Sequence, residues 1–250
     1  MRFAHLTLAA LALAFAAASP RAAARPPPQP VMVELFTSEG CSACPPADAL
    51  LDRLAHEQPV AGAEVIALEL HVDYFDRAGK TDPYSQAAFG ARQAEYIKAF
   101  GKRGAYTPQM VIDGQREIVG AQERETHDAI ADAAHAQKAK VQVARDDDKL
   151  KVTVNGLADV GGGAVDLWLA ITEEGLRSGE GSAATAGHGP VVRRLERVSS
   201  LSGSASGPVV VKDIELSLDG SWRRDRLRAV AFLQRAKTLE IVGVGVIGLR

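Results

Sequence analysis

The chain has 250 residues, enough for one large domain or two small ones, and 46% of them are hydrophobic. Its formal net charge of −2 and the lack of a long basic run argue against a nucleic-acid-binding protein. The sequence contains 2 cysteines, so its thiol chemistry rests on one pair.

The N-terminus has the pattern of a secretory signal peptide. Arg2 supplies a positive charge, residues 6–17 form an apolar stretch, and alanine-rich positions beyond it offer A-x-A cleavage sites. The apolar stretch is short for a bilayer span, although an uncleaved membrane anchor is the alternative. We therefore expect residues 1–24 to be a cleaved signal peptide and the protein to be periplasmic or secreted. Residues 25–30 form a stiff proline-rich linker.

Both cysteines lie between a predicted strand and a predicted helix. A short apolar run at residues 31–36 predicts a buried strand. The helix is expected at residues 45–57, where proline suits the first turn. Free N–H groups at its start would favour thiolate over thiol at Cys41. The two-residue spacer lets Cys44 attack a mixed disulfide formed on Cys41, which indicates disulfide exchange.

Two other interpretations of the CxxC motif stay open. A structural disulfide that closes so short a loop would stabilise the fold by only about 2 kcal/mol. Zinc usually needs four ligands, and the sequence has no second CxxC and no HxxxH pair. A cuprous ion, in contrast, can be held by two thiolates alone. The alternatives are therefore a Cu(I)-binding chaperone and a non-catalytic interaction module stapled by its disulfide.

The rest of the first half alternates strands and helices. A second strand is expected at residues 65–72 and an amphipathic helix at residues 84–100. The strand–helix–strand unit predicts a right-handed crossover with parallel strands. Residues 105–120 read as a hairpin around an Asp-Gly turn, and Thr107-Pro108 at its start is where a cis peptide could be held. A helix at residues 122–137 follows.

Three acidic or basic side chains are candidates for tuning the cysteine pair. Parallel strands end at one edge of the sheet, so we expect His71 and Asp73 near Cys41, where either would act as general acid or base. The alternatives are a histidine bonded to a backbone carbonyl and an aspartate that caps the next segment. Glu34 lies in an otherwise buried strand. We interpret it as the proton acceptor for Cys44 or, alternatively, as an edge residue or the partner of a basic residue.

The pattern changes near residue 138, where we expect a domain boundary. About seven strands separated by turn signals follow, which is typical of a β-sandwich. The prediction is a redox domain at residues 31–138 and an all-β, sandwich-like domain at residues 139–250. The second domain shows no catalytic constellation, so we expect it to serve docking, with residues 175–190 as a lid or contact surface. We interpret His188 as a loop histidine, with a role as a ligand as the alternative. Its strands are expected at residues 141–143, 150–154, 165–171, 191–198, 209–216, 227–233 and 239–247.

The predicted order of elements in residues 31–137, βαβαββα, resembles the thioredoxin superfamily. The most specific features are Cys41-Ser42-Ala43-Cys44 after the first strand and Thr107-Pro108 before the third. The resemblance implies an α/β thioredoxin-like domain in which the proline is cis, lies against the CxxC, keeps metals off and docks substrate backbone together with Thr107. The segments ELFTSEGCSACPPADALL, HVDYFD and YTPQMVIDG look like a family of secreted thioredoxin-like bacterial proteins catalogued only as a domain of unknown function.

The expected function is thiol–disulfide exchange outside the cytoplasm. No metal or organic cofactor is needed, because the dithiol itself carries the electrons. The expected partners are protein thiols or disulfides, together with a membrane protein that donates or accepts electrons.

Overall fold

The computed structural model describes residues 27–78, 82–177 and 187–250. The predicted signal peptide and most of the predicted lid at residues 175–190 lie outside these ranges. None of the helices within the described ranges combines the length and apolar character that crossing a bilayer requires.

The first half alternates strands and helices in the predicted order. Helix α1 has the predicted bounds, whereas β1 and β2 each begin two residues earlier than predicted, so the last two residues of the proline-rich linker belong to β1. The elements are β1 (Gln29–Thr37), α1 (Pro45–Glu57), β2 (Ala63–His71), η1 (Asp73–Ala78), α2 (Ala87–Ala99), β3 (Gln109–Ile112), β4 (Arg116–Val119) and α3 (Glu123–Ala133).

The second half is built from strands, and each strand predicted there is confirmed. Most run two to four residues longer than their apolar patterns indicated, because polar residues continue the ladders at the strand ends. The elements are β5 (Lys140–Asp146), β6 (Lys149–Asn155), η2 (Ala158–Val160), β7 (Ala164–Glu173), β8 (Val191–Ser202), β9 (Val209–Glu215), η4 (Arg224–Arg226), β10 (Leu227–Arg235) and β11 (Ile241–Gly248).

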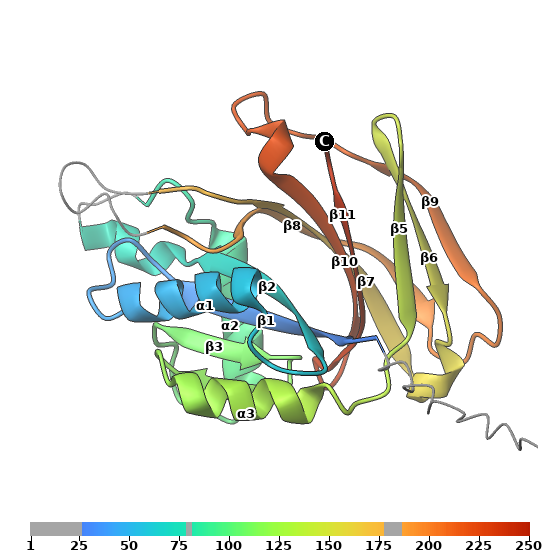
Figure 1. Ribbon diagram of the computed structural model, residues 1–250, viewed down its shortest axis with the longest axis horizontal. Helices are drawn as coiled ribbons and strands as arrows, with labels where there is room; N and C mark the ends of the chain where they lie inside the picture. The colour runs from blue at the N-terminus through green and yellow to red at the C-terminus, as the bar shows by residue number, and fades with distance from the viewer. Residues whose placement is uncertain (1–26, 79–81, 178–186) are drawn as a thin grey trace, which may run out of the picture.

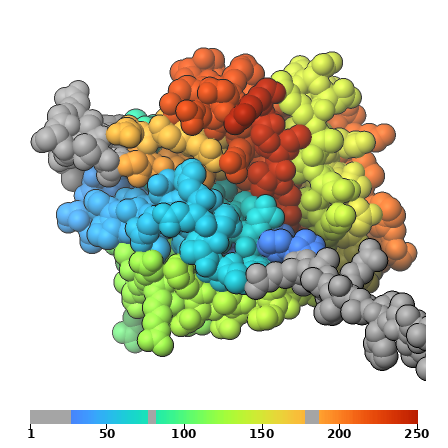
Figure 2. Space-filling model, viewed as in Figure 1, coloured from blue at the N-terminus to red at the C-terminus, as the bar shows by residue number. Residues whose placement is uncertain are grey.

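One large sheet runs through both halves, which corrects the prediction of two separate domains divided at residue 138. Its eight strands have the order β11-β10-β7-β8-β2-β1-β3-β4. The junction is a short parallel pairing of β2 with β8, at Glu69 and Val191, next to a hydrogen bond from Glu69 N–H to Pro190 O of 3.0 Å. Strand β2 is buried along most of its length, so its backbone needs a hydrogen-bonding neighbour at each edge, which β1 and β8 provide. The two halves also pack directly against each other in the space-filling view (Figure 2).

Helices cover both faces of the first half of this sheet (Figure 1). One hydrophobic cluster joins α1 and α3 to one face, through residues such as Leu51 and Ile130. A second cluster joins α2 to the other face through Phe89 and Tyr96. The separate three-stranded sheet β5-β6-β9 packs on the part of the large sheet formed by β7, β10 and β11. A sandwich-like core is therefore present, but one of its two layers belongs to the shared sheet.

Candidate functional site

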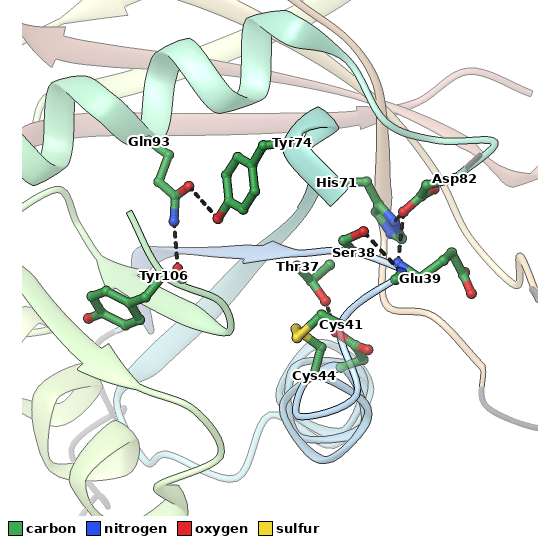
Figure 3. Close-up of a disulfide and its surroundings, with 12 residues drawn as sticks. Thr37, Ser38, Glu39, Cys41, Cys44, His71, Tyr74, Asp82, Gln93 and Tyr106 are labelled. Carbon is green, nitrogen blue, oxygen red and sulfur yellow. Dashed lines mark hydrogen bonds and ion pairs between the residues drawn. A yellow bond between two sulfur atoms is a disulfide. The ribbon is translucent and has the colours of Figure 1, made fainter. Parts of the chain in front are cut away.

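Cys41 and Cys44 form a disulfide where the chain passes from β1 to α1 (Figure 3). Their Cα atoms lie 5.4 Å apart. Cys41 N–H donates to Ser38 O at 3.0 Å, and Cys44 N–H donates to Cys41 O at 3.2 Å, so the loop is held by its own backbone. Cys41 is 6% exposed and Cys44 is 0% exposed, which makes Cys41 the more accessible of the two.

The start of α1 differs from the sequence-based expectation in its hydrogen bonds. The two prolines that follow Cys44 have no N–H group. The N–H groups of Ala47 and Asp48 both donate to Cys44 O, at 2.8 and 3.1 Å. The N–H groups of the first helical turn are therefore either missing or bonded to the chain itself. The electrostatic effect of this helix on Cys41 comes from its dipole, not from N–H groups free to bind a thiolate.

Asp48 is a buried carboxyl one helical turn after Cys44, on the same face of α1. Its Oδ1 accepts a hydrogen bond of 2.6 Å from Thr37 Oγ1. Burial, followed by the negative charge of Glu69, raises the pKa of Asp48 to about 7, against the smaller opposing effects of the Thr37 hydrogen bond and the nearby histidines. Such a group exchanges protons at neutral pH. The sequence analysis missed it, although a carboxyl among the leucines of the buried helix face was the available signal.

A cluster of charged side chains lies beside the disulfide loop, and we call Glu39, Glu69, His71, Asp82 and His188 the charge cluster. The ring nitrogens of His71 lie 2.8 Å from Asp82 Oδ2 and 3.0 Å from Glu69 Oε1. Those of His188 lie 2.6 Å from Glu69 Oε1 and 2.8 Å from Glu39 Oε1. Burial lowers the pKa of both histidines, but hydrogen bonds to these carboxylates outweigh it and raise the pKa of His71 to about 9 and that of His188 to about 10.

The charge cluster connects the disulfide loop to the second half of the chain. Glu39, two residues before Cys41, donates its backbone N–H to Asp82 Oδ2 at 2.8 Å and lies against His188 through its side chain. His188 lies in a loop, as predicted, but its side chain is buried and contacts two carboxylates. The second half therefore contributes a charged side chain to the site, in addition to any docking role.

The structure places the two predicted strand-end residues differently. His71 pairs in register with Thr37 at the end of β1, which is the predicted edge of the sheet. Its ring contacts carboxylates, not the backbone carbonyl that the alternative interpretation expected. Asp73 begins η1, as the capping alternative expected, and its carboxylate lies close to Gly90 of α2. Asp73 therefore lies against α2 and is not part of the charge cluster.

Glu34 is not placed to take a proton from Cys44, which corrects that prediction. Its carboxylate oxygens lie 2.5 and 3.0 Å from Nε and Nη2 of Arg92 in α2, and Tyr96 OH donates to it at 2.5 Å. Alternate residues of a strand face opposite sides of the sheet, so Glu34 faces α2 while its neighbour Leu35 faces α1. The alternative, a pairing with a basic residue, is the one that the structure shows.

The Thr107–Pro108 peptide is cis, as predicted. Strands β1 and β3 are antiparallel and pair Phe36 with Gln109. Pro108 immediately precedes Gln109, and Phe36 is followed by Thr37, the last residue of β1. The cis proline therefore lies at the end of the sheet where β1 leads into the disulfide loop.

Two tyrosines flank the loop on the side away from the charge cluster (Figure 3). Tyr74, which is 37% exposed, donates its hydroxyl proton to Gln93 Oε1 at 3.1 Å. Gln93 in turn donates to Tyr106 O at 2.8 Å. These bonds hold the segment before the cis proline against η1 and α2.

Comparison with known proteins gives a family and two similar structures. The sequence model of a family described as "Protein of unknown function (DUF1223)" matches residues 32–234. The crystal structure of a protein from Agrobacterium tumefaciens has 26% sequence identity and a TM-score of 0.72, and the match covers 88% of this chain and 94% of that one. HBP35 of Porphyromonas gingivalis shares the fold, with 17% identity, a TM-score of 0.61 and coverage of 89% and 76%. No curated protein matches the sequence.

Proposed function

We propose that this chain, which belongs to the DUF1223 family of proteins of unknown function, is an exported thiol–disulfide oxidoreductase with a thioredoxin-like active site. The observation that carries the proposal is the Cys41–Cys44 disulfide at the start of α1, with the buried carboxyl of Asp48 one helical turn further on and a cis Thr107–Pro108 peptide just before β3, the strand that pairs with β1. A disulfide with a purely structural role would need neither the cis proline nor the buried carboxyl. The parallel β1 and β2 around α1, followed by antiparallel β3 and β4, support the thioredoxin-like assignment.

The chemistry follows from the exposure of the two cysteines. In the oxidised protein a substrate thiolate attacks the sulfur of Cys41, the disulfide breaks, and Cys44 leaves as a thiolate. Asp48 supplies a proton to that thiolate. A second substrate thiolate then attacks the mixed disulfide, which releases Cys41 and an oxidised substrate. Two electrons pass from the substrate dithiol to the protein, and the reduced protein runs the same steps in reverse.

The surroundings indicate protein substrates. Tyr74 is 37% exposed on the side of the disulfide loop away from the charge cluster (Figure 3), and an exposed aromatic side chain suits contact with an extended polypeptide. The pattern of residues 1–24 supports export, so the electrons would be exchanged with protein thiols or disulfides and, finally, with a membrane protein.

Trapping experiments test the proposal. Cys44→Ser should accumulate a mixed disulfide through Cys41 with a peptide disulfide, seen as a reductant-sensitive mass shift, whereas Cys41→Ser should accumulate none. Ser42→Ala is the matched control in the same loop and should turn over substrate. If the unmodified protein fails to accelerate insulin reduction and Cys44→Ser traps nothing, the disulfide is structural. Stoichiometric Cu(I) binding without turnover would instead support the copper-chaperone alternative.

A further inference from the structure

We propose that Glu69, His71 and His188 bind one divalent transition-metal ion, with Zn²⁺ as the preferred occupant. One ligand atom from each of these residues lies within 4.8 Å of the other two, and all three residues are buried. Two imidazoles and one carboxylate form the ligand set of catalytic zinc sites, in which a fourth position takes water or substrate. The proposal is independent of disulfide exchange, since it uses no sulfur atom.

The three proposed ligand atoms already have nearly the spacing that a metal ion requires. Oε1 of Glu69 lies 3.0 Å from Nε2 of His71 and 2.6 Å from Nδ1 of His188. Ligands about 2 Å from a tetrahedral ion lie about 3.3 Å from one another, so each atom must move by roughly 1 Å or less. A bound dication would take the place of any ring protons that face Glu69, and those protons would leave to solvent.

Each proposed histidine ligand is oriented by a carboxylate on its other nitrogen. Asp82 Oδ2 lies 2.8 Å from Nδ1 of His71, and Glu39 Oε1 lies 2.8 Å from Nε2 of His188. This carboxylate–histidine arrangement fixes the ring and the nitrogen that faces the metal. Both histidines therefore present one nitrogen inward and one outward, as metal-binding histidines do.

The third ligand and the cover of the site are also held in place. Glu69 Oε2 accepts a hydrogen bond of 2.6 Å from Gly189 N–H, which leaves Oε1 facing the two rings. The ring of Tyr84 packs on both imidazoles, with centroids 5.3 Å from His71 and 5.7 Å from His188. The side chain of Glu39 is 24% exposed, so the charge cluster reaches solvent at this residue.

A purely structural ion-pair cluster is the competing explanation. Burying charged groups costs desolvation energy, and apolar residues of similar volume stabilise a core as well or better. Coordination of a dication recovers that cost, because the metal interacts with all three ligands at once. The proximity of Glu39 to Cys41 also means that the occupied site would hold the turn that carries the disulfide.

Zinc titration tests the inference on the purified full chain, stripped with a chelator and kept oxidised so that Cys41 and Cys44 offer no thiolate. Calorimetry and elemental analysis should give one Zn²⁺ per chain, and Co²⁺ should show the absorption bands of a tetrahedral site. Replacing both cysteines with serine should leave the stoichiometry unchanged. His188→Gln should weaken Zn²⁺ binding by at least about 100-fold.

A second set of variants keeps the test decisive if His188→Gln does not fold. Asp82→Asn and Glu39→Gln leave all three ligands in place and should weaken Zn²⁺ binding by about 10- to 100-fold. His135→Gln, at an exposed histidine near the end of α3, should leave it unchanged. Circular dichroism verifies folding. Failure of the full chain to bind Zn²⁺, or equal affinity in the folded Asp82→Asn, Glu39→Gln and His135→Gln variants, would overturn the proposal without affecting the redox assignment.

Discussion

Replacing Asp48 with asparagine should change the pH dependence of stability more than any other single substitution in α1. The side chain is buried, and its pKa of about 7 compares with 3.8 for an ordinary aspartate. A carboxyl that binds its proton more tightly in the folded chain contributes stability at low pH, below about 4, and that contribution disappears as the pH rises through about 7. The pKa difference corresponds to about 4 kcal/mol.

Asparagine keeps an oxygen that can accept the Thr37 hydrogen bond, but it does not ionise. Near pH 4 the variant and the unmodified protein should therefore have similar free energies of unfolding. Near pH 8, where Asp48 is charged in the unmodified protein, the variant should be more stable by up to about 4 kcal/mol.

Urea unfolding followed by tryptophan fluorescence measures this difference across the pH range, in the presence of a chelator so that no metal occupies the charge cluster. Asp52→Asn is the matched control, because Asp52 lies in the same helix with its side chain 40% exposed. Asp52→Asn should change the free energy of unfolding by less than about 1 kcal/mol across the same pH range, because the side chain and its partner His56 are both exposed. A constant difference between Asp48→Asn and the unmodified protein from about pH 4 to pH 8 would refute the account of Asp48.

Two further predictions concern positions away from the disulfide. Glu34→Gln leaves the buried Arg92 without its anionic partner, so urea unfolding should show a loss of about 3–5 kcal/mol, while the rate of disulfide exchange should not change. Gly114→Ala would place a Cβ atom 1.9 Å from Leu239 O at a φ of +67°, so thermal melting should show a loss of more than about 4 kcal/mol. Gly101→Ala has the same φ and no atom within 4 Å, so it should cost only about 1–2 kcal/mol.

Each of these two predictions has a result that would contradict it. Slow disulfide exchange in a folded Glu34→Gln variant would mean that Glu34 acts on Cys44 despite facing α2. Equal destabilisation by the two glycine variants would mean that the positive φ, and not the close approach of Leu239, determines the loss of stability in Gly114→Ala.

The elements of the fold could be predicted well because each one buries a face with its own periodicity. Helix α1 shows apolar spacing after a proline start, and β6 shows strict alternation over Lys149–Asn155. Which strands become neighbours is a different question, because pairing is decided between distant segments. The apolar character of β2 indicated a central strand, but nothing local identified β8 as its second neighbour.

The site was predictable where the chemistry was local. The cysteine pair and the Thr-Pro peptide are contiguous motifs, and both lie at the same end of β1. Asp48 was missed because the helix was identified from the spacing of its apolar residues, and the carboxyl that shares their buried face was not considered. Glu34 was assigned to the wrong face of the sheet. Alternate residues of β1 face opposite sides, and Glu34 faces α2 instead of the side that carries the disulfide.

The charge cluster shows why the two halves form one functional unit. Glu69 lies within the apolar strand β2, where an unpaired carboxylate would be costly. Three consecutive residues of the second half meet this need: His188 bonds to the Glu69 side chain, Gly189 N–H donates to it, and Pro190 O accepts the Glu69 N–H. The same His188 contacts Glu39 in the disulfide loop. A chain cut near residue 138 would therefore lose β8, one of the two neighbours of β2, and leave Glu69 without these partners, so the disulfide loop depends on the second half for its electrostatic environment.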